Sequence, residues 1–269
     1  MDGFRGLYAA GQACGSSGYE EAAAQGLLAG VNAVLALGDR GPFLLRRDQA
    51  YIGVLVDDLV HRWGSEPYRI FTARAEHRLL LRADNADERL TPPAAELGLV
   101  PGKAARRTGL KYRWRDELVR WAEARRLKKA DGERLGLEGL EGVSAAELVR
   151  RGVEGCAALV RELALGDGSL PPDLLVDLET ASPEGLAGEA LDSALVDLRY
   201  AGYLERERAL LERRAALERL TIPAGLDFRR VLGLRREAAE RLENSRPRSV
   251  AEAGSLPGVN PPDAVSYTH

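Results

Sequence analysis

Three glycines and two serines lie close together near the start of the chain, where their spacing suits the binding of an anion. Residues 11–18 read Gly-Gln-Ala-Cys-Gly-Ser-Ser-Gly and separate a short apolar run from an Ala-rich stretch. This order predicts a strand, a tight turn and a helix N-terminus, where unpaired N–H groups and the helix dipole attract phosphate. Ser16 or Ser17 could cap the helix, and Gly26 and Gly30 would let it pack closely on a sheet. The pattern leaves open both a cofactor site and a purely structural turn.

The same stretch resembles a segment of the MnmG (GidA) family, flavoproteins that modify the wobble uridine of certain tRNAs. Gly11-Gln12 followed by residues 18–30 is similar to the second FAD-contacting segment of that family. The resemblance implies that Gln12 contacts the cofactor. The implied cofactor-binding residues are Gly11, Gln12, Gly15, Ser16, Ser17, Gly18 and Tyr19. Cys14 departs from the polar residue that the family has there, and a lone loop cysteine is more often an inert small residue than a redox group.

A second match to the family runs from Ser65 to Thr91 and is rich in arginine. If this segment is a helix beginning at Ser65, arginines spaced by four would lie along one face, as planar donors suited to phosphate or to base stacking. The resemblance implies a tRNA-binding role here. The arginines to which we assign that role, including one from the following helix, are Arg69, Arg74, Arg78, Arg82, Arg89 and Arg113. In the alternative, Arg74 and Arg78 pair with Glu76 or Asp84 nearby. We expect His77, where the family commonly has Tyr, to serve packing or capping.

The distribution of charge also suits a polyanion. The net charge is −3. Between His61 and Ala130, however, 17 Lys and Arg face 9 Asp and Glu, a local balance of +8 that leaves −11 for the remainder. Each phosphate neutralised by such a segment releases counterions and favours binding at low salt. Charge counting alone favours the alternative, a solvated helical face.

Apolar periodicity predicts the longer helices. Residues 106–130 form a basic amphipathic helix whose apolar stripe is Leu110, Trp114, Leu118 and Trp121. Such a helix could attach to a membrane, but a surface that faces tRNA or a partner fits the neighbouring segments better. A further helix is expected over residues 190–220.

Two smaller patterns carry specific expectations. Residues 48–59 have apolar positions at helical spacing and include the pair Asp57-Asp58. We interpret this pair as the polar face of a helix, because adjacent residues point in different directions and should not converge on one atom. Ser144 and Glu147 have the spacing of a capping box.

Composition bounds the class of protein. The chain has 269 residues, of which 45% are hydrophobic, and two distant cysteines, Cys14 and Cys156. The small number and wide separation of the cysteines favour a reducing, cytoplasmic setting. The sequence has no apolar run of about 18 residues, so it predicts no membrane span.

The expected fold is mainly α: a remnant of an α/β FAD-binding domain, as strand, loop and helix, followed by a helical C-terminal domain. We place its parts at 1–60 (FAD-domain remnant), 61–140 (basic tRNA-binding connection) and 141–265 (helical domain that meets the GTPase MnmE).

The resemblance also implies an activity. In the intact family protein, FAD and the GTPase partner MnmE support addition of an aminomethyl-type group to C5 of the wobble uridine. Methylene-tetrahydrofolate and NADH are co-substrates there, and the full-length protein is a homodimer. The Gly-x-Gly-x-x-Gly fingerprint and the family's catalytic cysteines are absent from the printed sequence. We therefore expect this chain to be inactive alone.

Two alternatives and one doubt remain. The first alternative is a free-standing tRNA-binding module without flavin. The second is the related folate- and FAD-dependent tRNA uridine methyltransferase, which lacks the long helical tail after Gly188. The doubt concerns the end of the chain, because residues 265–269 resemble translated adaptor sequence, and we expect both ends to be artefactual.

Overall fold

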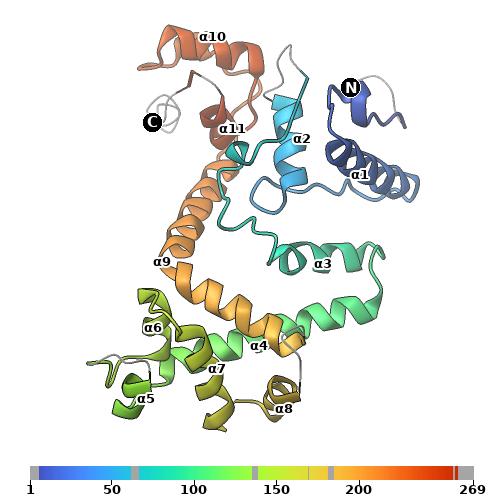
Figure 1. Ribbon diagram of the computed structural model, residues 1–269. Helices are drawn as coiled ribbons and strands as arrows, with labels where there is room; N and C mark the ends of the chain where they lie inside the picture. The colour runs from blue at the N-terminus through green and yellow to red at the C-terminus, as the bar shows by residue number, and fades with distance from the viewer. Residues whose placement is uncertain are drawn as a thin grey trace. The chain divides into compact units, whose positions relative to one another are not determined.

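Helices account for nearly all of the regular structure, and the mainly α expectation is confirmed (Figure 1). The computed structural model describes residues 6–61, 67–134, 139–168, 170–180, 185–256 and 258–259. Within these ranges, β pairing is limited to isolated bridges. The chain forms two compact units, which we call the first unit (1–78 and 206–269) and the second unit (79–205). The predicted parts 1–60, 61–140 and 141–265 describe roles rather than compact bodies and stay a prediction.

The first unit contains the loop and most of the arginine-rich segment. Its N-terminal elements are the 3-10 helix η1 (Gly11–Cys14), α1 (Tyr19–Leu37), α2 (Tyr51–His61) and the 3-10 helix η2 (Thr72–Arg74). Its C-terminal elements are η3 (Phe228–Arg230), α10 (Arg236–Ser245) and α11 (Val250–Ser255). The C-terminal elements pack around Phe228 and Leu242, which are almost completely buried.

The second unit is a helical bundle. It comprises α3 (Ala86–Glu96), α4 (Gly102–Ala124), α5 (Lys129–Arg134), α6 (Ala145–Arg151), α7 (Cys156–Asp167) and α8 (Pro172–Thr180). The long helix α9 (Leu186–Arg219) contributes its residues through Glu205 to this unit and its remaining residues to the first unit.

The core of the second unit confirms the predicted apolar stripe. Trp114, Leu118 and Trp121 are buried on α4 and pack with α6, α7, α8 and the start of α9. The helix ends at Ala124 and not at residue 130. There the chain turns to pair with residues 142–145 by backbone hydrogen bonds, which competes with continued helix. The predicted cap is present, because Ser144 Oγ accepts the N–H of Glu147 at 3.1 Å.

The predicted strand before the loop is wrong for the described residues. The backbone is extended at Ala10 but has no ladder partner there, and a strand requires one. No sheet therefore lies under Gly26 and Gly30, and a methyl group at either position would meet nothing within 4 Å. The caps are also different from the expectation: α1 begins after Gly18, without a side-chain cap from Ser16 or Ser17.

A helix that begins at Ser65 and continues through Arg74, Arg78 and Arg82 is also wrong for the described residues. Residues 65 and 66 lie outside the described part, and residues 67–85 form turns and the short helix η2 before α3 begins. The physical reason is that side chains bind the carbonyl groups that a helix would use. Arg47 Nη2 donates to Arg74 O at 2.9 Å, and Asn85 Nδ2 donates to Leu80 O at 3.2 Å. Arg74, Arg78 and Arg82 therefore do not form a ladder along one helix.

Candidate cofactor loop and arginine segment

The loop over residues 11–18 is held by one buried amide side chain. Gly11 and Gly15 have φ of 72° and 78°, a left-handed backbone that glycine adopts without strain. Gln25, on α1, accepts the N–H of Gly11 through Oε1 at 2.5 Å and donates through Nε2 to Ser16 Oγ at 2.5 Å. All three residues are buried. The Ser16 hydroxyl therefore stabilises the conformation of the loop by accepting this bond from Gln25.

Several backbone N–H groups of the loop have partners in the protein, in addition to the bond from Gly11 to Gln25. Gly15 N donates to Gln12 O, Ser16 N donates to Gly11 O, and Ser17 N donates to Tyr68 O. The carboxylate of Glu21 lies against Gly18 at the N-terminus of α1, in the position that a side chain at Gly18 would occupy. A carboxylate at this end of a helix takes the place that the dipole offers to another anion.

Glu21 also fixes the segment that follows Tyr68. Its Oε1 accepts the N–H of Ile70 at 3.1 Å and lies 3.9 Å from Arg69 Nε. The hydrogen bond from Ile70 is the main cause that holds the pKa of Glu21 below its usual value. Tyr68 adds a second link, because its N–H donates to Gly15 O at 2.8 Å within a parallel bridge to Ser16. The loop and residues 68–70 are therefore one connected structure.

The loop suits the flavin ring of FAD better than it suits the pyrophosphate. Gln12, Ser17 and Tyr19 have exposed side chains, and that of Tyr19 is 93% exposed. An amide, a hydroxyl and an aromatic ring suit a neutral, planar group such as the flavin ring. A pyrophosphate fits poorly, because Glu21 carries negative charge at the helix N-terminus and the N–H groups of Gly15, Ser16 and Ser17 bind carbonyl groups of the protein.

Arg47 is the centre of a buried ionic cluster next to this loop. Its guanidinium donates from Nη1 to Asp57 Oδ2 at 2.8 Å and to Asp58 Oδ1 at 2.5 Å, and it also contacts Glu76. The interpretation of Asp57-Asp58 as a polar face is therefore wrong, because both carboxylates converge on one nitrogen. The long side chain of Arg47 lies against α2 and reaches both carboxylates, although the Asp57 and Asp58 side chains leave the helix in different directions. Burial lowers the pKa of Arg47, but the bonds to Asp58 and Glu76 outweigh burial and raise it.

Tyr68 connects this ionic cluster to Arg74. The Tyr68 hydroxyl donates to Asp58 Oδ2 at 3.0 Å, and burial together with this carboxylate raises its pKa. The Arg74 guanidinium lies over the Tyr68 ring, 4.9 Å from its centroid, and 3.6 Å from Asp58. Its Nε donates to Arg69 O at 3.1 Å. The alternative in which Arg74 pairs with an acidic residue is thus correct in kind, although the partner is Asp58.

The other predicted tRNA-binding arginines differ in exposure. In the first unit, Arg69 is exposed, and Arg78 is exposed without an ion pair among the described residues. In the second unit, Arg82 is partly buried and lies 2.9 Å from Asp197, and Arg89 donates to the backbone of Arg82. Arg113 is exposed and lies 3.2 Å from Asp173.

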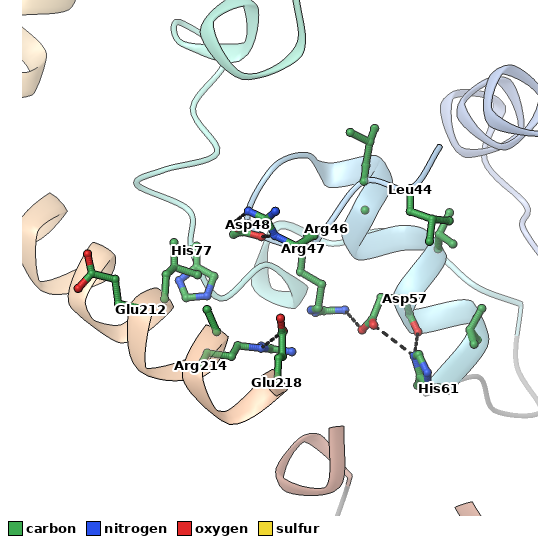
Figure 2. A pocket seen from close by; sticks show the side chains of 16 residues that line it. Leu44, Arg46, Arg47, Asp48, Asp57, His61, His77, Glu212, Arg214 and Glu218 are labelled. Carbon is green, nitrogen blue, oxygen red and sulfur yellow. Dashed lines mark hydrogen bonds and ion pairs between the residues drawn. The ribbon is translucent and has the colours of Figure 1, made fainter. Parts of the chain in front are cut away.

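A cavity of about 660 Å³ lies beside α2, within the first unit, and Arg47 and Asp57 of the ionic cluster are among its lining residues. Figure 2 shows α2, with Asp57 and His61, on one wall of the cavity and Arg214 and Glu218 of α9 on the other.

His77 is buried at the edge of this cavity, and its Nδ1 lies 2.6 Å from Glu207 Oε2. Packing was the correct expectation for His77. Acidic and basic groups alternate along the cavity, and no cluster of metal-ligating side chains occurs in the described ranges.

Sequence reasoning missed the residues that hold this region together: Gln25, Glu21, Arg47 and Tyr68. The only available signal was the polar character of Glu21 and Gln25 on an Ala-rich helix, one turn apart. Arg47 contacts Glu76 from 29 positions away, a separation that local patterns do not report.

No helix in the described part of the chain has the combined length and apolar character of a membrane span.

Comparison with known proteins relates both ends of the chain to one family. Residues 1–40 match the family model "Glucose inhibited division protein A", and residues 211–268 match "tRNA modifying enzyme MnmG/GidA C-terminal helical bundle". The structure is similar to that of Aquifex aeolicus GidA in the form II crystal. The TM-score is 0.75 and the identity 32%, over 100% of this chain and 40% of that one.

Curated relatives give the same result. The chain is 43% identical over 264 residues to "tRNA uridine 5-carboxymethylaminomethyl modification enzyme MnmG" of Syntrophotalea carbinolica. It is 46% identical over 262 residues to the protein of the same name from a strain of Thermus thermophilus. These alignments cover 96% and 97% of this chain, and the chain spans 39% of the length of each relative.

Proposed function

We propose that this chain, which belongs to the MnmG/GidA family, is part of an enzyme that modifies uridine in tRNA. The observation that carries the proposal is the identity of 43–46% over nearly the whole chain to proteins named as tRNA uridine modification enzymes. The reaction is addition of a carboxymethylaminomethyl (aminomethyl-type) group to C5 of the wobble uridine, with methylene-tetrahydrofolate as donor of the methylene carbon, glycine or ammonia as donor of the nitrogen, and NADH as reductant of the flavin. We place it in the cytoplasm, in a protein that forms homodimers when complete.

The cofactor of this proposal is FAD, held by residues Gly11 to Tyr19 together with groups outside the described chain. FAD supplies the redox chemistry of the modification when it is bound. Gln12, Ser17 and Tyr19 would contact the flavin ring, and Gly11, Gly15, Ser16 and Gly18 would keep the loop in shape. Support comes from the exposure of the first three side chains and from the Gln25 bonds that fix the others.

This division of roles predicts how flavin binds to the isolated chain. Because the loop offers contacts for the ring but none for the pyrophosphate, the chain should not retain FAD through dialysis and should be colourless. Any weak binding, measured by quenching of flavin fluorescence, should be equal for riboflavin and FAD. A yellow protein with stoichiometric FAD would contradict this assignment.

The substrate of this proposal is tRNA, bound through exposed arginines. Arg69, Arg74 and Arg78 are the strongest candidates because their side chains reach solvent in the first unit. Arg113 is a further candidate in the second unit, whereas Arg82 and Arg89 serve mainly to hold residues 82–89 in place.

A filter-binding titration of the isolated chain with tRNA tests this substrate. We expect binding at low salt, with the logarithm of affinity falling linearly against the logarithm of salt concentration. A double-stranded DNA of similar length should compete less well, because the proposal requires features of folded RNA. Absence of tRNA binding at low salt would overturn the proposal for this chain.

The partner of this proposal is the GTPase MnmE, which we place against the helical part of the chain, residues 141–265. Leu232 is 92% exposed beside η3 and has the most exposed large apolar side chain among the described residues of that part. Leu232→Glu should therefore weaken co-purification with MnmE. Leu37→Glu, which changes an 88% exposed leucine of α1, is the matched control and should not. Equal loss in both variants would place the contact elsewhere.

A further inference from the structure

Phe71 projects from a backbone that is fixed on both sides. Its side chain is 61% exposed, whereas Phe228 is buried and Phe43 is partly buried. Before it, Ile70 N donates to Glu21; after it, Arg74 N donates to Phe71 O at 2.9 Å. Arg74 O in turn accepts from the buried Arg47. A fixed backbone that holds a large aromatic ring in water indicates a contact surface for that ring.

The surroundings of Phe71 are cationic. Arg69, two positions before it, has a side chain that is 61% exposed, and Arg74, three positions after it, is 39% exposed. Arg78 is also exposed. The nearby carboxylates have partners in the protein: Asp58 is buried with Arg47 and lies 3.6 Å from Arg74, and Glu21 accepts the N–H of Ile70 and lies 3.9 Å from Arg69. Glu76 is 38% exposed and pairs with Arg47. With Arg69, Arg74 and Arg78 against this one glutamate, positive charge predominates over residues 69–78.

We propose that Phe71 is a stacking platform for an unpaired RNA base, with Arg69, Arg74 and Arg78 contacting the backbone on either side of that base. This inference rests on the proposed tRNA substrate and adds to it the recognition of a single-stranded, unstacked nucleotide. Aromatic rings set among cations are how proteins hold single-stranded nucleic acid, because every base has a face that can stack. The Arg74 guanidinium, stacked on Tyr68, offers a second planar surface of the same kind.

The chemistry of the surface favours RNA over a protein partner. Large contiguous apolar patches mark protein-interaction sites, and the buried centre of a protein interface is more apolar than its rim. The residues that follow Phe71 are Thr72, Ala73 and Arg74, all exposed, and they provide no such patch. Duplex nucleic acid is also a poor fit, since its bases are stacked within the helix and cannot reach a protruding ring.

Two substitutions at Phe71 distinguish loss of base stacking from loss of charge contacts and from loss of folded structure. Phe71→Leu removes the aromatic face and keeps an apolar side chain, and Phe71→Tyr keeps the face. The probes are an RNA hairpin with an unpaired loop and an RNA duplex of the same length, both titrated by fluorescence anisotropy at several salt concentrations. Val34→Ala, at a 70% exposed position on α1, is the control for loss of an unrelated apolar side chain.

We expect Phe71→Leu to weaken hairpin binding about tenfold, to leave duplex binding unchanged and to keep the wild-type salt slope. Phe71→Tyr and Val34→Ala should bind as wild type, and thermal unfolding should be the same for all four proteins. Equal hairpin affinity of wild type and Phe71→Leu, or equal losses on hairpin and duplex, would overturn the stacking role while leaving the tRNA substrate in place. Failure of the wild type to bind either RNA would overturn both.

Discussion

Arg47 and Asp58 form a buried ion pair in which Nη1 and Oδ1 are 2.5 Å apart and the two side chains are 5% and 2% exposed. Asp57 and Glu76 contact the same guanidinium from more exposed positions. Buried charges are costly unless they are paired and hydrogen-bonded. This pair therefore links α2 to residues 74–76 and thereby sets the course of the chain around Phe71 and Arg74.

Removing the cation of this pair should strongly destabilise the first unit. Arg47→Met leaves Asp58 buried without its main partner, and we expect a loss of about 3–5 kcal/mol in the free energy of unfolding. Arg46→Met is the matched control: Arg46 is 61% exposed, and its pair with Asp48 should contribute less than about 1 kcal/mol. Urea denaturation measures both. Similar losses in the two variants would show that burial of Arg47 is not what matters.

Two glycines of the first unit should respond in opposite directions to alanine. A methyl group at Gly53 in α2 would collide with the carbonyl oxygen of Arg46 and lie 2.6 Å from that of Leu45, so Gly53→Ala should cost about 1–3 kcal/mol. At Gly26 in α1 nothing lies within 4 Å, and Gly26→Ala should stabilise by roughly 0.5–1 kcal/mol. Thermal unfolding of the pair tests the close approach of α2 to residues 45–46. Stabilisation by both substitutions would contradict it.

The stability of the first unit should fall on acidification through Glu21. The pKa of Glu21 is lower in the folded protein than its ordinary value of 4.5. Its contribution is therefore complete above about pH 4.5 and is lost as the pH falls through the folded pKa. Glu21→Gln should be less stable than wild type at neutral pH, and the difference should shrink below about pH 4.5. Denaturant unfolding across pH measures this.

Glu20 provides the control for that series, because it lies beside Glu21 but is exposed. Glu20→Gln should stay within about 0.5 kcal/mol of wild type over the same pH range. A difference between wild type and Glu21→Gln that did not change with pH would show that the carboxylate charge makes no contribution.

The helices were predictable where packing follows local periodicity. The stripe of Trp114, Leu118 and Trp121 repeats at helical spacing, and Ser144 carries its capping partner three residues ahead. Residues 67–85 were not predictable in this way. Their arginines also have helical spacing, but their carbonyl groups are bound by side chains such as Arg47 and Asn85, which local periodicity does not reveal.

The candidate site was predictable in its residues more than in their roles. The glycines and Ser16 form a loop as expected, but their N–H groups and the Ser16 hydroxyl bind within the protein because of Gln25 and Tyr68. Likewise, Asp57 and Asp58 were recognised as a pair, but only the structure brings Arg47 between them. Long-range partners decide which polar groups are left for a ligand.

The salt dependence of tRNA binding should depend on Arg78. This side chain is exposed and has no ion pair within the described ranges, so its charge is available to a phosphate at little cost in stability. Arg78→Ala should weaken tRNA binding and lower the slope of the logarithm of affinity against the logarithm of salt by about 1. Arg219→Ala, which removes an exposed arginine from the mixed-charge end of α9, should change neither. A filter-binding titration at several salt concentrations compares them, and identical slopes for wild type and Arg78→Ala would assign Arg78 to the solvated surface.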